Sequence, residues 1–430
     1  MFERRVTMSE EKYIIDKYMP ELCADAAERY AIPGRIFTSA VHRGLRNEDG
    51  TGVLVGATRI GSVRGYTMED GERVPMDGQL LYRGIRVSDL VENHWQTGTF
   101  GYEEVAYLLL MGDGTFDNRN LLTTSGTPYL LTYQADNSYY EPYAYATDDY
   151  FGYMDDNEGT SEKDPIIQFG IGRLPVTSAT MADNVVDKLI NYMNNDNAGA
   201  WHNQLTFLAD DGDTGLMHTG QADSVARQLA LRTPGFILNK IYLEGYQQEV
   251  SAAGESYPLA KSRLDNMLNN GTLYFNYTGH GSSLNLSSEA MITQASIQAM
   301  SNRNRALWML ATCSFSHFDR NVSSSGEDAV TNANGGAIGV IGACRTVFAE
   351  PNMRLNMWFS NYLFTRSDGE YPRIGDALRM AKNRLTNFNK DSDNLNRRAY
   401  LLLGDPAIRL HYPEPYHVTT DSINGVYTDE

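Results

Sequence analysis

Residues 272–313 read TLYFNYTGHGSSLNLSSEAMITQASIQAMSNRNRALWMLATC, and this stretch holds two short apolar segments that each end in a reactive side chain. The first runs into Gly279-His280-Gly281, and the second runs into Cys313. Short apolar runs bounded by turn residues are typical of buried strands. A short helix is expected between them, at 294–300. The stretch therefore predicts a strand–helix–strand unit of an α/β fold.

The same alternation continues on both sides of this unit. Strands are predicted at 166–176, 204–209, 236–243 and 336–343, and helices at 179–195, 220–232, 259–269, 326–333 and 373–388. Strands that alternate with helices indicate a mostly parallel sheet flanked by helices. Upstream, residues 87–111 are predicted to form two helices that meet at Thr97–Gly98, and residues 112–164 form a region rich in loops and tyrosine.

The composition indicates a globular protein and argues against several other classes. The chain has 430 residues, 42% of them hydrophobic, which is typical of a globular protein. Lys plus Arg number 36 against 54 for Asp plus Glu, and a net charge of −18 argues against general nucleic-acid binding. Three cysteines are too few for a disulfide framework. The N-terminal stretch contains no apolar run of signal-peptide length.

His280 and Cys313 are the candidate reactive pair. The carboxyl ends of parallel strands share one edge of a sheet, so the two side chains meet if their strands are neighbours. A thiol becomes a nucleophilic thiolate when a base such as imidazole lies nearby. The backbone N–H groups of Gly281 and Cys313 are candidates for stabilising an oxyanion. A helix expected directly after Cys313 would favour the thiolate further.

Other interpretations of these residues remain open. A single cysteine after a buried strand is more often an inert core residue, and Cys23 and Cys344 are interpreted in this way. His317, four residues after Cys313, is a rival base. The sequence contains no G-x-S-x-G elbow, no Walker phosphate loop, no H-E-x-x-H and no paired C-x-x-C, so it does not support a serine hydrolase, an NTPase or a zinc enzyme.

Two acidic loops are weak candidates for calcium binding, because carboxylate oxygens are the ligands that calcium prefers. One loop contains Asp155, Asp156 and Glu158, and the other contains Asp210, Asp211 and Asp213. Neither loop matches an EF-hand, and solvated loops are the alternative interpretation. We therefore expect no required cofactor and leave a structural calcium ion as an open alternative.

Several segments resemble the gingipain-type cysteine peptidases. They are LYFNYTGHGSS at 273–283, LWMLATCSFSHFDR at 307–320, GIGRLPV at 170–176 and LLLGDPAIRL at 401–410. The resemblance runs from about residue 110 to 412. It implies a caspase-like fold, with a first subdomain at 112–200 that is shorter than in the family and a second, catalytic subdomain at 201–412. It also implies that Cys313 is the nucleophile and His280 the base.

Within this family, Phe315, Phe318-Asp319-Arg320 and Tyr412-Pro413 resemble the sortases of the type IX secretion system. Such enzymes work at the outer-membrane surface with other secretion components. They cleave C-terminal signals from secreted cargo proteins and join the new carboxyl end to an amine acceptor such as anionic lipopolysaccharide. The alternatives are a plain secreted endopeptidase, and a non-catalytic secretion-partner module, because the first subdomain is short.

This chain departs from the family pattern at one position, and segments outside the matched region resemble other proteins. Many relatives carry an acidic residue where this chain has Gln168, so a third, orienting carboxylate is in doubt. Gln168 and Asp155 are the candidates for orienting the base or for contacting the substrate. Residues 42–63, 78–92 and 100–112 resemble the N-terminal region of citrate synthase, which implies a chimera with a mainly helical fragment at 1–111. Residues 413–430 resemble the start of a further β domain.

Overall fold

The computed structural model describes part of the chain. The described residues are 61–69, 72–82, 85–86, 107–114, 130, 132–135, 143–154, 166–195, 197–212, 215–252, 254–367, 369–386, 391–413, 422–423 and 426–427. The chain divides into two compact units, Met1–Glu103 and Glu104–Glu430. The first unit contains an antiparallel sheet of β1 (Gly61–Glu69), β2 (Glu72–Tyr82) and β3 (Ile85–Arg86). The rest of that unit lies outside the described residues, so the helical fragment resembling citrate synthase stays a prediction.

The second unit is built on an eight-stranded sheet. Its order is β4 (Tyr107–Met111), β7 (Gly170–Leu174), β17 (Tyr400–Gly404), β16 (Gly339–Ala343), β15 (Leu307–Ala311), β12 (Tyr274–Thr278), β8 (Gln204–Ala209) and β9 (Ile237–Tyr242). Strands β9, β8, β12, β15 and β16 run parallel to one another. Strand β17 is antiparallel to β16, and β7 and β4 follow the direction of β17. This arrangement confirms the predicted parallel-rich sheet.

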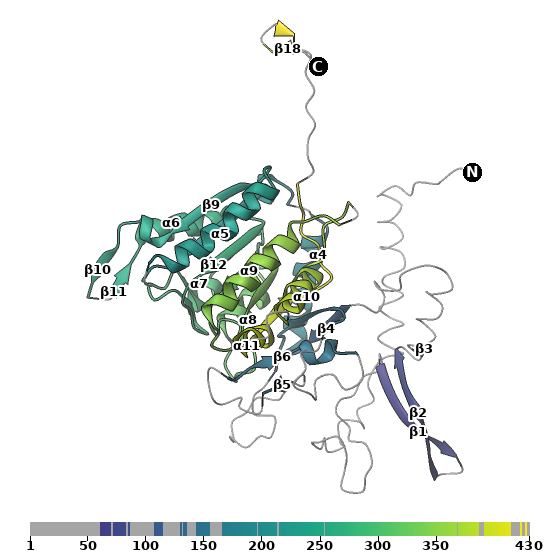
Figure 1. Ribbon diagram of the computed structural model, residues 1–430. Coiled ribbons are helices and arrows are strands. Elements are labelled where there is room, and N and C mark those ends of the chain that lie inside the picture. Colours follow the sequence, from purple (N-terminus) through teal and green to yellow (C-terminus); the bar gives the residue numbers. More distant parts are fainter. Residues whose placement is uncertain are drawn as a thin grey trace. The chain divides into compact units, whose positions relative to one another are not determined.

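Helices cover both faces of this sheet (Figure 1). They are α4 (Ala179–Met193), α5 (Met217–Arg232), α6 (Pro258–Asn270), α7 (Gln294–Gln298), α8 (Ser325–Thr331), α9 (Ala349–Leu363), α10 (Ile374–Leu385) and α11 (Asp391–Ala399). Helix α5 connects β8 to β9, toward one edge of the sheet. Helices α6, α7 and α8 connect β9 to β12, β12 to β15 and β15 to β16, in the opposite direction. Because crossover connections are right-handed, α5 covers one face and α6 to α8 cover the other. Helix α9 packs on α5 and α10, and α4 packs on α8.

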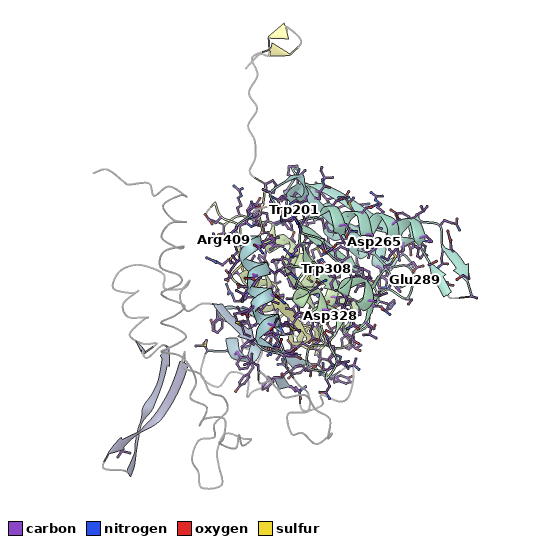
Figure 2. All side chains as sticks on the ribbon, turned by 180° about the vertical axis from the view of Figure 1, so that it is seen from behind. Trp201, Asp265, Glu289, Trp308, Asp328 and Arg409 are labelled. Atoms are coloured by element: carbon purple, nitrogen blue, oxygen red, sulfur yellow. The ribbon has the colours of Figure 1, made fainter. Side chains whose placement is uncertain are left out.

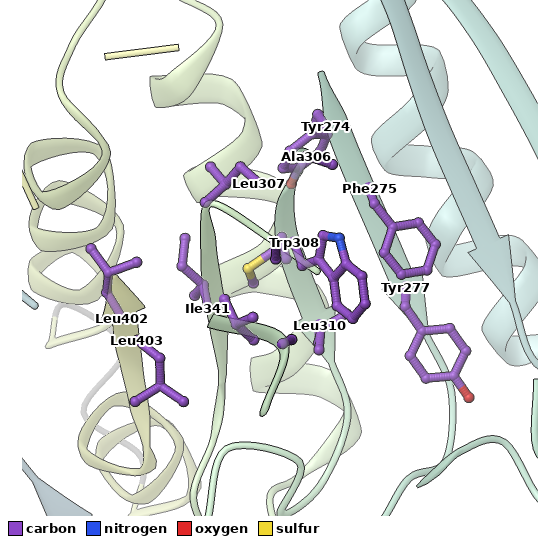
Figure 3. Packing of buried hydrophobic residues seen from close by; sticks show 14 of the residues in the cluster. Tyr274, Phe275, Tyr277, Ala306, Leu307, Trp308, Leu310, Ile341, Leu402 and Leu403 are labelled. Carbon is purple, nitrogen blue, oxygen red and sulfur yellow. The ribbon is translucent and has the colours of Figure 1, made fainter. Parts of the chain in front are cut away.

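The core holds β12 and β15 together. Every residue of β15 is buried, as expected for a strand with helices on both faces. Figure 3 shows the Trp308 indole pointing toward β12, where its ring centroid lies 5.4 Å from that of Phe275 in an edge-on contact. Burying a large aromatic side chain contributes about 2–3 kcal/mol. Phe275 and Trp308 are also paired residues in the register of the two strands.

One predicted element is wrong. Residues Tyr107–Met111, expected to end a helix, form the edge strand β4 and pair with β7. A five-residue apolar run has the same pattern in a buried strand as in a buried helix, so the pattern alone does not distinguish them. Among the residues that the structure describes, no helix is both long and apolar enough to cross a bilayer.

The remaining elements are short. They are β5 (Tyr133–Gln134), β6 (Ala146–Thr147), β10 (Glu249–Ser251), β11 (Gly254–Ser256), β13 (Asn285–Leu286), β14 (Ile292–Thr293), β18 (Ser422–Ile423), β19 (Val426–Tyr427) and the 3₁₀ turns η2 (Asp149–Gly152), η3 (Ala200–Asn203) and η4 (Leu243–Gly245). Strands β13 and β14 form a small hairpin just after His280.

Candidate active site

Strands β12 and β15 are neighbours, as the proposed meeting of His280 and Cys313 requires. Their register places Thr278 opposite Ala311, and the Gly279 N–H extends the ladder by donating to the Ala311 carbonyl at 3.3 Å. His280 and Cys313 each lie two residues beyond that paired position. Adjacent strands are about 4.8 Å apart, so the turns that carry the imidazole and the thiol start side by side.

The glycines that flank His280 allow these turns to pack closely. A Cβ atom on Gly281 would lie 2.5 Å from the Thr312 hydroxyl oxygen, next to Cys313. A Cβ atom on Gly279 would lie 2.3 Å from the Asp210 Cβ atom and 2.5 Å from the Tyr277 hydroxyl. Real Cβ atoms do not approach so closely, so only glycine fits at either position without a shift.

The Cys313 thiol is half-buried and faces the backbone of Val347. The Val347 N–H donates to the Cys313 Sγ atom at 3.5 Å. The thiol in turn donates to the Val347 carbonyl at 3.8 Å. Ser314 has a left-handed backbone with φ of 51°, so the chain turns sharply directly after Cys313.

The helix expected directly after Cys313 is absent from this described segment. The chain forms turns up to Ser323, and the next helix, α8, begins at Ser325. Phe315 and Phe318 are fully buried within these turns, so packing of side chains overrides the helical spacing. No helix dipole therefore starts at the thiol.

The backbone of His280 is fixed while its side chain is exposed. Its N–H donates to Asp210 Oδ2 at 2.9 Å, and its carbonyl accepts from the Tyr277 hydroxyl at 2.6 Å and from the Ser287 N–H at 3.0 Å. The imidazole ring lies edge-on to the buried ring of His218, with 5.0 Å between centroids. These contacts hold the turn and leave the imidazole on the solvent side.

Asp210 is the carboxylate that the structure brings to His280. It follows β8, the strand next to β12, and it is buried. Burial raises the pKa of Asp210 to about 6, opposed by the hydrogen bond from the His280 N–H and assisted by Glu289. The sequence singled out Asp210 only as a calcium candidate. Its place at the carboxyl end of a predicted strand was the signal for a role beside His280.

Of the other candidate residues, the structure describes Gln168. Gln168 precedes β7, which β17 and β16 separate from β15, and its N–H donates to the Gly152 carbonyl at 2.9 Å. The structure therefore does not bring Gln168 to the strand of His280. Asp155 and Asp213 lie outside the described residues. The oxyanion role of the Gly281 and Cys313 amides stays a prediction, with both residues at the same edge.

The rival base His317 is part of an ion-pair network. Its Nε2 atom lies 3.3 Å from Asp319 Oδ1. The same carboxylate binds Arg345 through two short contacts and accepts from the Gln134 side chain at 3.0 Å. The Arg345 carbonyl accepts from the Ser314 N–H at 3.1 Å. The network thus anchors the turn that follows Cys313.

Adding one methyl group beside His280 is expected to impair the site. In Gly279→Ala the new Cβ atom must displace Asp210 or Tyr277, both of which bind the His280 backbone. A displacement of about 1 Å costs up to about 100-fold in rate, so we expect kcat/KM for peptide cleavage to fall by about 10–100-fold. Gly220→Ala, in a helix with open space around it, is the matched control and should leave the rate unchanged. An active Gly279→Ala variant would contradict this account of the turn.

Comparisons with known proteins show the family and the fold of this chain. The model of "Peptidase family C25" matches residues 85–411. The fold is similar to that of the Arg-specific cysteine proteinase gingipain R (RgpB), with 16% identity, a TM-score of 0.53, and coverage of 76% of this chain and 69% of that chain. No curated protein sequence matches the chain.

Two further solved structures are similar to this chain. The complex of Porphyromonas gingivalis RgpB pro- and mature domains has 15% identity and a TM-score of 0.52, covering 76% of this chain and 70% of that chain. Dimeric latent PorU from Porphyromonas gingivalis has 18% identity and a TM-score of 0.32, covering 71% of this chain and 23% of that chain. At these identities the two RgpB structures establish a shared fold.

Proposed function

This chain belongs to peptidase family C25 and is a cysteine peptidase, and on this premise we propose that Cys313 is the nucleophile and His280 the base. The observation that supports these roles most strongly is the register of β12 and β15, which brings the two turns together at one sheet edge. Cys344, the other described cysteine, is fully buried and its thiol donates to the Ala146 carbonyl at 3.1 Å.

In the proposed reaction, Cys313 attacks the carbonyl carbon of a peptide bond and its thiol proton passes to His280. The amide N–H groups at this edge stabilise the oxyanion that forms. His280 then gives the proton to the departing amine, the C–N bond breaks, and a thioester remains on Cys313. Water or an amine attacks the thioester, loses a proton to His280, and releases a carboxylic acid or an amide together with the free thiol.

Labelling with iodoacetamide near pH 6 tests the pair directly. An ordinary thiol reacts slowly at this pH, because only the thiolate is nucleophilic. We expect selective modification of Cys313, and loss of that modification in His280→Ala, with the adduct located by mass spectrometry. The matched variant His317→Ala should keep the labelling.

Cys344 serves as the internal control of the same experiment. Burial raises the pKa of its thiol to about 11, so it should stay unmodified in the folded protein and react only after unfolding. Equal, slow labelling of Cys313 in both the wild type and His280→Ala would contradict the proposed pair. Loss of labelling in His317→Ala alone would contradict the assignment of His280 as the base.

We further propose that the enzyme is a sortase-like transpeptidase of the type IX secretion kind, acting at the outer-membrane surface or outside the cell. Its substrates would be secreted proteins with C-terminal signals, its partners outer-membrane secretion components, and its acceptor an amine such as that of anionic lipopolysaccharide. Support for this finer proposal comes from the residues around Cys313 and from Tyr412-Pro413, which resemble that branch of the family. A plain endopeptidase is the alternative.

An acceptor assay separates the two reactions. A peptide that ends in a secretion signal is incubated with the enzyme and a simple primary amine, and the products are weighed by mass spectrometry. A transpeptidase is expected to give a new carboxyl end joined to the amine, in a yield that rises with amine concentration. Exclusive formation of the free acid at every amine concentration would establish hydrolysis instead, while Cys313→Ala should give neither product.

A further inference from the structure

One buried asparagine binds the backbone beside Cys313. Asn396 lies in α11, and its side chain is fully buried. Its Oδ1 atom accepts from the Phe348 N–H at 2.8 Å, and its Nδ2 group donates to the Phe348 carbonyl at 2.8 Å. One side chain thus binds both polar groups of a single residue, as a neighbouring antiparallel strand would. These bonds restrain the peptide units on both sides of the Phe348 Cα atom.

One of these two peptide units also faces Cys313. The unit between Val347 and Phe348 donates its N–H to Asn396, and its carbonyl accepts from the Cys313 thiol at 3.8 Å. The preceding unit presents the Val347 N–H, which donates to the Cys313 Sγ atom at 3.5 Å. Asn396 therefore restrains the segment through which Val347 contacts the sulfur.

Further polar side chains support Asn396 from within the core. Its Nδ2 group also donates to Asn352 Oδ1 at 2.8 Å, and the Tyr400 hydroxyl lies 3.0 Å from the same oxygen. The Tyr400 hydroxyl also lies 3.2 Å from the Leu310 carbonyl of β15, the strand that leads to Cys313. A buried hydrogen-bond network of this kind keeps its members in one arrangement.

The two contacts of Val347 act differently on the two forms of the thiol. The carbonyl contact requires the S–H proton, so it is lost when the thiol ionises. The N–H contact remains and strengthens, because hydrogen bonds to a charged acceptor are about twice as strong as neutral ones. Such a bond favours the charged form. A restrained Val347 thus keeps its N–H on the sulfur and limits the approach of its carbonyl, which would retain the proton.

We propose that Asn396 is a positioning residue, which keeps the Val347 N–H on the sulfur of Cys313 and thereby supports the thiolate. The inference rests on the proposed role of Cys313 as the nucleophile and deepens it. Asn396 acts from inside the fold, because it is buried like Trp308 of β15, which Figure 2 labels among the packed side chains. It therefore affects the thiol without contacting a substrate.

The pH dependence of iodoacetamide labelling tests this role. Asn396→Ala removes both bonds to Phe348, and we expect the labelling rate of Cys313 near pH 6 to fall by at least about 10-fold, since a hydrogen bond to a charged group is worth about that factor. Near pH 10 the thiol is ionised in both proteins, so the two rates should agree within about threefold. The midpoint of the rate profile should therefore move to higher pH.

Asn383→Ala is the matched control. Asn383 of α10 binds a backbone in the same way, because its Oδ1 atom accepts from the Ile167 N–H at 2.9 Å and its Nδ2 group donates to the Ile167 carbonyl at 2.8 Å. Ile167 precedes β7, which β17 and β16 separate from β15. Loss of this pairing should lower Tm and leave the labelling profile of Cys313 unchanged.

Three results would overturn the inference, once circular dichroism shows that the variants are folded. The first is a wild-type labelling profile in Asn396→Ala. The second is an equal movement of the midpoint in Asn383→Ala, and the third is a rate in Asn396→Ala that is lowered by one factor at every pH.

If Asn396→Ala does not fold, Asn352→Leu decides instead, because it removes the amide that supports Asn396. The Tyr400 hydroxyl then keeps the Leu310 carbonyl as its partner. The midpoint should move in the same direction, with a fall of at least about threefold near pH 6, as expected for the loss of one neutral hydrogen bond. An unchanged profile would overturn the inference.

The same data separate this inference from the proposed reaction. Labelling of Cys313 that is lost in His280→Ala but unchanged in folded Asn396→Ala leaves the reaction standing and overturns the inference. Labelling of wild-type Cys313 no faster than that of an ordinary thiol contradicts the reaction and the inference together.

Discussion

Replacing Cys313 with alanine is expected to abolish peptide cleavage, with a fall in kcat/KM of about four orders of magnitude or more. The thioester cannot form without the sulfur atom, and what remains is substrate binding and oxyanion stabilisation. Cys313 is only half-buried and its turn is held by other residues, so the folded structure should persist. The measurement is cleavage of a fluorogenic peptide together with circular dichroism of both proteins.

The matched control for this variant is Cys344→Ala. This thiol lies in the core and bonds to the Ala146 carbonyl, so its loss should lower stability modestly and leave kcat/KM within a few fold of the wild type. Activity retained in Cys313→Ala, or lost in Cys344→Ala with the fold intact, would contradict the proposed nucleophile.

Breaking the buried ion pair of Arg345 is expected to have the largest effect on stability. The Arg345 guanidinium binds Asp319 at 2.7 and 2.6 Å, and both groups are almost fully buried. Arg345→Met leaves the Asp319 carboxylate buried without its main partner. Removing one member of a buried pair costs about 3–5 kcal/mol in the free energy of unfolding. Urea unfolding at pH 7 measures this loss.

The pH dependence of this effect follows from the Asp319 carboxyl. Burial by itself would raise its pKa, but the hydrogen bonds from Arg345 and His317 outweigh burial and hold the pKa well below the usual 3.8. A depressed carboxyl pKa contributes stability that is complete above the unfolded value and is lost as the pH falls below it. The difference in unfolding free energy between wild type and Arg345→Met should therefore shrink below about pH 4.

Arg409→Met is the matched control, because Arg409 pairs with Glu370 on the surface. Exposed pairs contribute about 0–1 kcal/mol, so this variant should unfold almost like the wild type. Equal losses in the two arginine variants would contradict the expected contribution of the buried Arg345–Asp319 pair.

Much of the fold could be predicted because its strands and helices follow from patterns of neighbouring residues. The strands that became β8, β9, β12, β15 and β16 are short apolar runs with turn residues at their ends. Their order along the chain, with helices between them, restricts the topology to a parallel-rich sheet. Tyr107–Met111 was mistaken for part of a helix, because its five apolar residues fit both structures.

Helix α4 shows where local patterns stop being informative. Met181, Val185, Leu189 and Met193 are spaced four residues apart, which predicts that they share one buried face. Met193 is half exposed, while the charged residue Lys188 is buried. The Lys188 ammonium donates to the carbonyls of Ala329, Val330 and Asn332 at the end of α8. A buried lysine is explained only by the carbonyls of another helix, which no periodicity reveals.

The sequence by itself determined the α/β class, the strand ends that carry His280 and Cys313, and the glycines that let their turns approach. These depend on apolar periodicity and turn chemistry, which act over a few residues. Only the tertiary structure decided which acids accompany them. Asp210 meets His280, and Glu289 meets Asp210, because β8 lies beside β12 and the hairpin after His280 folds back over that edge. Such contacts join loops that are far apart in the chain, and strand order in the folded sheet sets their distances.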